Sequence, residues 1–187
     1  MTAITSPTVP RSQPREHVHD EPLYEIIDGQ HVELPPMSIL ASRVASRLHT
    51  CLGLHLHGKP LGEALMETLV RLPLPVDRNR RPDLAFVSAE RIAQAPPQPG
   101  SDNAWDVVPE LMVEVVSPHD LAEEIMERLG EYWAAGAKLV WIVYPTQRLV
   151  YVYESLRQVR ILGEADELDG GIVLPSLRIP IASLFPG

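Results

Sequence analysis

Two carboxylates stand in apolar segments, where an unpaired acid is costly. Asp83 directly follows Pro82 and opens the segment DLAFVS, and Glu114 is the only charged residue in the run LMVEVV. A buried carboxylate is usually ion-paired, hydrogen-bonded or bound to a metal. Asp83 and Glu114 lie 31 positions apart in the chain, which leaves room for one strand, a loop and a neighbouring strand. If the two strands pair, both side chains can meet at one edge of a sheet.

The chemistry that two such acids could perform depends on what they bind. Two carboxylates and one backbone carbonyl form an all-oxygen site of the kind that Mg²⁺ prefers. Such an ion can activate water and stabilise charge on a phosphodiester during in-line displacement. The residues alone leave a second interpretation open, in which each acid pairs with a nearby arginine such as Arg80 or Arg81.

The segments that would position these acids alternate between strand-like and helix-like patterns. Asp28-Gly29 suits the turn of a β-hairpin, and Ser38 is a suitable N-cap for a helix with apolar residues on one side. In the first half of the chain, the patterns predict a hairpin over 23–34, a helix over 38–57, a strand over 64–74, a polar turn over 76–82 and a strand over 83–88. In the second half they predict a strand over 107–117, a helix over 119–135 and strands over 138–145 and 148–155. Ser117 or Asp120 could cap the second helix. This order predicts an α/β domain with one central mixed sheet flanked by helices and preceded by a β-hairpin.

Length and composition favour a single domain with a tail. Residues 1–22 contain four prolines and no apolar periodicity, so we expect a disordered or loosely attached tail. Residues 23–187 would then form one domain, with a core drawn from a chain that is 45% apolar. A single cysteine, Cys51, excludes an intramolecular disulfide and a multi-cysteine metal site. No membrane-spanning run and no secretory pattern is visible, so the expected location is the cytoplasm.

The charge balance argues against a protein that coats nucleic acid by bulk attraction. Sixteen basic residues face 25 acidic ones, for a formal net charge of −9, whereas phosphate binding gains affinity from clustered Lys and Arg. Only Lys59 and Lys138 are lysines. A local groove could still counter the overall acidity, and the candidates for it are Arg43, Arg47, Arg71, Arg78, Arg80 and Arg81.

Several segments, in collinear order, resemble the Uma2 family of restriction-endonuclease-like proteins within the PD-(D/E)XK nuclease superfamily. They include YEIIDG, RPDLAFV, PELMVEVVSPHDLAEEIMERLGEYWAAGAKLVWIVYP and IPIASLF. The resemblance extends from about Leu23 to Phe185. It implies a restriction-endonuclease-like fold and a divalent-metal-dependent DNA endonuclease, using Mg²⁺ or Mn²⁺. A homodimer is also expected, because cutting both strands of a duplex suits two-fold symmetry.

The resemblance also implies roles for particular residues. Asp83 matches the aspartate of the family's Pro-Asp pair, and Glu114 matches the acid of the second half-motif, so both would be metal ligands. The backbone carbonyl of Val115 would be a third ligand. Glu25 lies where such proteins often carry another acid and could complete the metal shell; the other interpretation of Glu25 is a surface or hairpin acid.

The chain departs from the family pattern at its lysine. The position two after Glu114 is Val116, and the helical Lys-x-x-x-Tyr pattern found in relatives is here Arg128 followed by Tyr132. Arginine could hold a phosphate or stabilise a developing anion, but it does not readily exchange a proton. The second interpretation of Arg128 is an exposed residue on a solvated helix face, paired with Glu123, Glu124, Glu127 or Glu131. The alternative function is therefore a catalytically weakened or inactive nuclease-fold protein that acts as a binding or assembly module.

Overall fold

The computed structural model describes residues 22–96 and 104–186. The predicted tail, residues 1–22, falls almost entirely outside this part of the chain. In chain order the elements are β1 (Tyr24–Ile27), β2 (Gln30–Glu33), α1 (Ile39–Leu56), β3 (Gly62–Met66), β4 (Val70–Arg71), β5 (Arg78–Arg80), β6 (Leu84–Ser88), α2 (Ala89–Gln94), β7 (Leu111–Val115), α3 (Ala122–Ala135), β8 (Leu139–Tyr144), β9 (Leu149–Ser155), β10 (Gln158–Leu162), β11 (Glu167–Gly170), β12 (Leu174–Pro180) and α4 (Ile181–Leu184).

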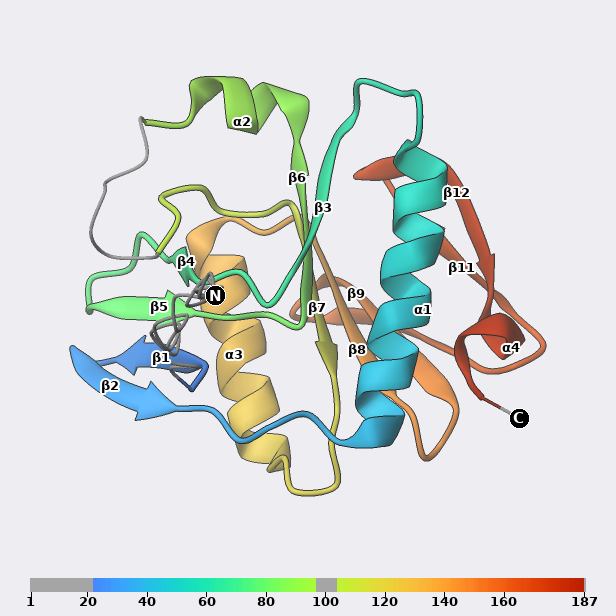
Figure 1. The fold of residues 1–187 in the computed structure, drawn as a ribbon, viewed down its shortest axis with the longest axis horizontal. Helices are drawn as coiled ribbons and strands as arrows, with labels where there is room; N and C mark the ends of the chain where they lie inside the picture. The colour runs from blue at the N-terminus through green and yellow to red at the C-terminus, as the bar shows by residue number, and fades with distance from the viewer. Residues whose placement is uncertain (1–21, 97–103, 187) are drawn as a thin grey trace, which may run out of the picture.

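A six-stranded mixed sheet forms the centre of the molecule. Its strand order is β10-β9-β8-β7-β6-β3, in which β7 and β8 run parallel and the other neighbours are antiparallel. The parallel pair is joined through α3, as a parallel connection requires. Helices α1 and α3 lie on opposite sides of this sheet (Figure 1). The predicted α/β class with one central mixed sheet and an N-terminal hairpin is confirmed.

The alternation of side chains along the central strands builds two apolar layers. Leu111, Val113 and Val115 of β7 face the core on the α1 side, together with residues of β8, β11 and β12. Met112 faces the other core, where Ile125, Leu129 and Tyr132 of α3 pack. Because strand side chains alternate between faces, Glu114 lies on the same side as Met112 and therefore faces α3.

Local signals in the sequence account for the first hairpin and the first helix. Asp28 and Gly29 both have positive φ values, 51° and 74°, as the favoured two-residue hairpin turn requires. Ser38 caps α1, because its Oγ accepts a hydrogen bond from the backbone N–H of Ala41 at 3.2 Å. Both predictions are confirmed. The second long helix differs at its start: α3 begins at Ala122 after Leu121, and neither Ser117 nor Asp120 caps it.

The region between α1 and β6 was predicted wrongly in two places. The predicted strand over 64–74 is two strands in different sheets, β3 and β4, interrupted by Glu67 with a φ of 46°. The predicted polar turn over 76–82 contains β5, whose three residues are buried. This strand joins a second sheet of order β2-β1-β5-β4. Its arginines are stabilised by acids from β1 and α3, which no local pattern reveals.

Close approach of two strands makes Gly62 sensitive to substitution. Gly62 has a φ of 142°, and a Cβ atom there would lie 2.1 Å from the carbonyl oxygen of Val87 on β6. We expect Gly62→Ala to lower the free energy of unfolding by about 1–3 kcal/mol. Gly53→Ala, in α1 where a Cβ meets nothing within 4 Å, should instead raise it by about 0.5–1 kcal/mol. Urea unfolding of both variants measures the contrast, and equal effects would contradict it.

In the described part of the chain, no helix combines the length and the apolar character that crossing a membrane requires.

Candidate active site

The register of the central sheet brings the two predicted acids together. Strands β6 and β7 pair antiparallel with Leu84 opposite Val113. Extending that register by one residue places Asp83 opposite Glu114. Directly opposed residues of an antiparallel pair point to the same side of the sheet, with Cβ atoms about 4.5–5.5 Å apart. The side chains of Asp83 and Glu114 therefore project together toward α3.

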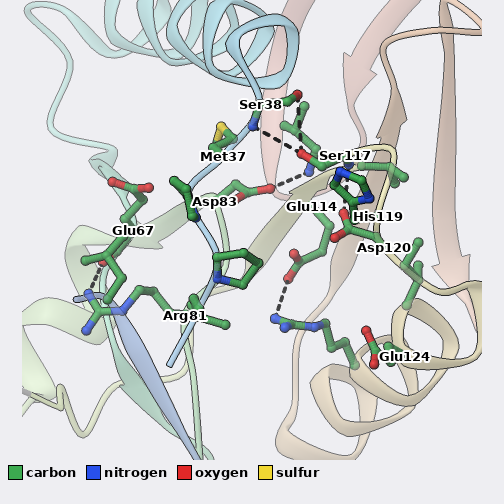
Figure 2. Close-up of a pocket in the computed structure, with 18 residues that line it drawn as sticks. Met37, Ser38, Glu67, Arg81, Asp83, Glu114, Ser117, His119, Asp120 and Glu124 are labelled. Atoms are coloured by element: carbon green, nitrogen blue, oxygen red, sulfur yellow. Dashed lines mark hydrogen bonds and ion pairs between the residues drawn. The ribbon is translucent and has the colours of Figure 1, made fainter. Parts of the chain in front are cut away.

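Both acids line a pocket of about 430 Å³. The pocket lies between the connection from β2 to α1, the ends of β6 and β7, and the start of α3 (Figure 2). Its other polar and charged lining side chains are Ser38, Glu67, Arg81, Ser117, His119, Asp120, Glu124 and Arg128, and its apolar wall is formed by Leu23, Leu34, Pro35, Pro36, Met37, Val115, Val116 and Ile125. The structure thus gathers residues from five separate segments around Asp83 and Glu114.

Asp83 is held at the pocket by the neighbouring strand. Its Oδ2 accepts a hydrogen bond from the backbone N–H of Val115 at 2.5 Å. Burial raises the pKa of Asp83 well above its usual range, and the charges of Glu114 and Asp120 raise it further. The Val115 hydrogen bond and the Arg128 charge only partly offset these effects. An acid in this setting gains from a bound cation.

Glu114 is anchored from α3. The hydroxyl of Tyr132 donates a short hydrogen bond to its Oε1, and Nη1 of Arg128 lies 3.9 Å from the same oxygen. Arg128 and Tyr132 are four residues apart, so both lie on the face of α3 that meets β7. Burial nevertheless raises the pKa of Glu114, an effect that Arg128 and Tyr132 reduce. Burial and the Glu114 charge likewise raise the pKa of Tyr132, which keeps its hydroxyl protonated as the donor.

Arg128 is a partly buried residue of the site, not a fully solvated one. Its side chain is 20% exposed and lines the pocket. Its Nη1 donates to Oε1 of Glu25 at 2.7 Å. Although burial by itself lowers the pKa of Arg128, the neighbouring charges of Glu114, Tyr132 and Glu25 raise it overall. The guanidinium is therefore firmly protonated and places a fixed positive charge beside the two acids.

Glu25 lies behind Arg128 and does not line the pocket. Its side chain is fully buried. Oε1 accepts from Arg128 and, at 2.8 Å, from the backbone N–H of Arg81, while Oε2 accepts from Nη1 of Arg80 at 2.9 Å. Both oxygens are thus occupied by cationic or backbone donors. Glu25 is thus an acid of the hairpin, in β1, but not a surface acid, and its contacts place it as the anchor of Arg128 and Arg80.

Arg80 and Arg81 bind partners other than the predicted metal ligands, Asp83 and Glu114. Arg80 forms ion pairs with Glu25 and Glu131, and Arg81 donates to the backbone carbonyls of Tyr24 and Glu67. Among the described residues, neither forms an ion pair with Asp83 or Glu114. The interpretation in which each acid pairs with an arginine therefore fails for Arg80 and Arg81. It holds in part for Glu114, which forms an ion pair with Arg128 at 3.9 Å.

The prediction of a basic groove built from the six candidate arginines is also wrong. The side chains of Arg78 and Arg80 are only 7% and 3% exposed and contact Glu131. Glu131 itself is 12% exposed, so it does not belong to a solvated helix face as predicted. Arg71 pairs with Asp106, and Arg47 donates to the carbonyl of Phe185. Most of these cations support the fold instead of forming one surface.

The donor set fits a hard divalent cation. In the described residues there is no group of three or more His, Cys, Asp and Glu side chains placed to hold a metal. Two carboxylates with raised pKa values face one pocket, and Mg²⁺ is typically bound through one or two carboxylates while keeping several waters. Asp83 and Glu114 suit that mode of binding. The Val115 carbonyl stays a prediction for the third protein ligand.

Residues that sequence reasoning did not place at the site come from the turn after β7 and from the segment before β6. His119, Asp120 and Glu124 line the pocket near the start of α3, and Glu67 and Arg81 line its other side (Figure 2). The spacing Ser117-x-x-Asp120 at a strand end was a usable signal, because such residues bond across a turn. Glu67 carried no comparable signal.

Comparisons with known proteins agree with this architecture. A crystal structure described as a "putative nuclease belonging to DUF820", from Anabaena variabilis, superposes with a TM-score of 0.73 at 19% sequence identity, covering 87% of this chain and 89% of that one. At this identity the likeness shows the fold alone. No curated protein matches the chain. The family model for Uma2, described as "Putative restriction endonuclease", matches residues 11–182, nearly the whole sequence. The chain therefore belongs to the Uma2 family.

Proposed function

We propose that this protein is a divalent-metal-dependent DNA endonuclease that hydrolyses phosphodiester bonds. The observation that carries the proposal is the β6–β7 register, which directs Asp83 and Glu114 into one pocket. Family membership and the nuclease fold support the same activity. The proposed cofactor is Mg²⁺ or Mn²⁺, held by these two carboxylates and the carbonyl of Val115.

The charge of the pocket supports a role for a cation. Five carboxylates line it against two guanidinium groups, so a DNA phosphate meets net negative charge there. When bound, a divalent ion supplies the positive charge that offsets this repulsion and the means to activate water. Neighbouring groups orient the two acids: Tyr132, which is buried beside the pocket, fixes the Glu114 carboxylate, and the backbone of Val115 fixes that of Asp83.

Arg128 has the position of a transition-state stabiliser. Its guanidinium lines the pocket beside Glu114 and is held in place by an ion pair with Glu25. Donors fixed before reaction are most effective where negative charge develops, because they need no reorganisation. In the proposed reaction, Arg128 donates to the oxygens of the phosphate under attack. Two copies acting as a homodimer would address both strands of a duplex.

Metal-dependent cleavage of supercoiled plasmid tests the proposed function. We expect purified protein to convert the plasmid to nicked and then linear DNA in Mg²⁺ or Mn²⁺, and EDTA to stop the reaction because the paired carboxylates then lack their cation. Agarose-gel quantification against time gives the rate.

A matched variant controls for cleavage by a contaminating nuclease. Asp83→Asn, purified identically, should show no cleavage above background. Cleavage that persists in Asp83→Asn or in EDTA would contradict the proposal. No cleavage by the wild type, together with no uptake of Mn²⁺ in calorimetry, would favour the binding or assembly module.

A further inference from the structure

One imidazole lines the pocket. Its other ionisable lining residues are carboxylic acids and arginines. Lys59 and Lys138, the only lysines in the chain, are exposed and do not line the pocket. Histidine is the side chain whose ordinary titration falls between about pH 5 and 8. His119 is the only histidine among the lining residues.

The turn that carries His119 is fixed to the site. Oδ2 of Asp120 accepts from the backbone N–H of Ser117 at 2.7 Å, and the N–H of Asp120 donates to the Ser117 carbonyl at 3.1 Å. Oγ of Ser117 lies 3.4 Å from both the backbone nitrogen and Oγ of Ser38, at the start of α1. The imidazole itself has no hydrogen bond or ion pair with any described residue. It therefore stands at the pocket rim on an ordered turn with its ring nitrogens free.

Figure 2 shows the imidazole near Ser117 and Asp120, on the side of the pocket where Glu114 lies and away from Arg81 and Glu67. His119 follows Val115 by four residues, in the turn that leaves β7, and both residues line the pocket. The charged groups around the pocket face it from every neighbouring element: Asp120 of its own turn, Glu124 and Arg128 of α3, Asp83 before β6, Glu114 of β7, and Glu67 and Arg81 of the opposite wall.

We propose that His119 is the general base of the cleavage reaction, replacing the lysine that this chain lacks. The proposal rests on the proposed endonuclease function. A ring nitrogen of His119 takes a proton from the attacking water while the water oxygen forms a bond to phosphorus. The bond from phosphorus to the leaving oxygen breaks, and the leaving oxygen takes a proton from solvent. The exposed imidazolium then returns its proton to solvent, so the net reaction is hydrolysis of one phosphodiester.

Comparison of two histidine variants tests the proposal. We expect His119→Ala to slow Mn²⁺-dependent plasmid cleavage by about 10²–10⁴-fold, the usual contribution of a positioned general base. Added imidazole, a small base that could act in place of the missing side chain, should restore part of the rate. His57→Ala, an exposed histidine that follows α1 and does not line the pocket, should behave as wild type throughout.

Metal uptake separates this role from ligation and from the proposed function itself. Calorimetric titration with Mn²⁺ should give the same affinity for His119→Ala as for the wild type. Cleavage that depends on Asp83 but is unchanged in His119→Ala would overturn the role of His119 alone. Loss of Mn²⁺ uptake in His119→Ala, or a rate that imidazole does not restore, would also overturn it. If the wild type does not cleave, both proposals fail together.

Discussion

Asp83→Asn is expected to abolish cleavage while making the metal-free protein more stable above neutral pH. The loss of cleavage should be about 10³-fold or more, because the cation would lose one of its two carboxylates and several kcal/mol of charge stabilisation. The gain in stability follows from the cost of keeping a charged carboxylate beside Glu114 in a partly buried site. Asparagine removes the charge, and its side-chain oxygen can still accept the hydrogen bond from Val115.

The sign of the pH dependence follows from the raised pKa of Asp83. The folded state holds its proton more tightly than the unfolded state, whose ordinary value is 3.8. The stabilising contribution of that proton is fully present below the unfolded value and is lost as pH rises through the folded pKa. In EDTA, Asp83→Asn should therefore exceed the wild type in melting temperature at pH 8. The difference should vanish below about pH 4.

Bound metal should reverse the order of the two melting temperatures, so that the wild type melts above Asp83→Asn. A ligand present at 100 times its dissociation constant stabilises the state that binds it by about 2.7 kcal/mol. For a chain of this size that corresponds to roughly 5–10 °C in melting temperature. The wild type should gain this shift in saturating Mn²⁺ and Asp83→Asn should gain almost none. Thermal melts in EDTA and in Mn²⁺ measure both effects on the same samples.

Asp77→Asn is the matched control, because Asp77 is exposed and does not line the pocket. It should follow the wild type in EDTA and in Mn²⁺. A shift in Mn²⁺ that is as large in Asp83→Asn as in the wild type would place the cation elsewhere. A variant less stable than wild type in EDTA at pH 8 would show that Asp83 is satisfied without a cation.

The central part of the site was predictable because its signals are local. Glu114 interrupts an apolar run, and Asp83 opens the candidate strand that precedes it in the chain. A sheet in which these two strands are neighbours is enough to bring the acids together. Hairpin and cap residues such as Gly29 and Ser38 also act within a few positions of themselves. Arg128 and Tyr132 are spaced by one helical turn, and in the structure both contact Glu114.

The ion pairs that hold the site residues in place were not predictable, because the paired residues are distant in the chain. Arg80 lies in a polar segment that suggests a turn, yet it forms a buried strand because Glu25 and Glu131 neutralise it. These pairings span 55 and 51 residues. Local hydrophobic periodicity carries no information about them. For the same reason the helical pattern around Glu131 predicts a solvated face, whereas the structure places Glu131 against Arg78 and Arg80.

The buried arginine–glutamate cluster yields the largest expected effect on stability. Glu25 is fully buried and shares its two oxygens between Arg80, 3% exposed, and Arg128. Removing one partner of a buried ion pair leaves an uncompensated charge and typically costs about 3–5 kcal/mol. We therefore expect Glu25→Gln to lower the free energy of unfolding by about that amount. Urea unfolding at pH 7.5 measures the change, with the slope of the transition checked for two-state behaviour.

Glu127→Gln supplies the contrast, since it removes an acid from the same cluster at an exposed position. Glu127 is 56% exposed and lies 3.9 Å from both Arg78 and Arg80, so its loss should cost no more than about 1 kcal/mol. Equal effects of the two variants would mean that the cluster is solvated and that Glu25 does not anchor Arg128. If Glu25→Gln is destabilised as expected, the low exposure of Arg80 explains the cost: its charge can be tolerated inside the fold only while Glu25 accompanies it. The same substitution then frees Arg128 beside Glu114, so cleavage should fall even at temperatures where the variant stays folded.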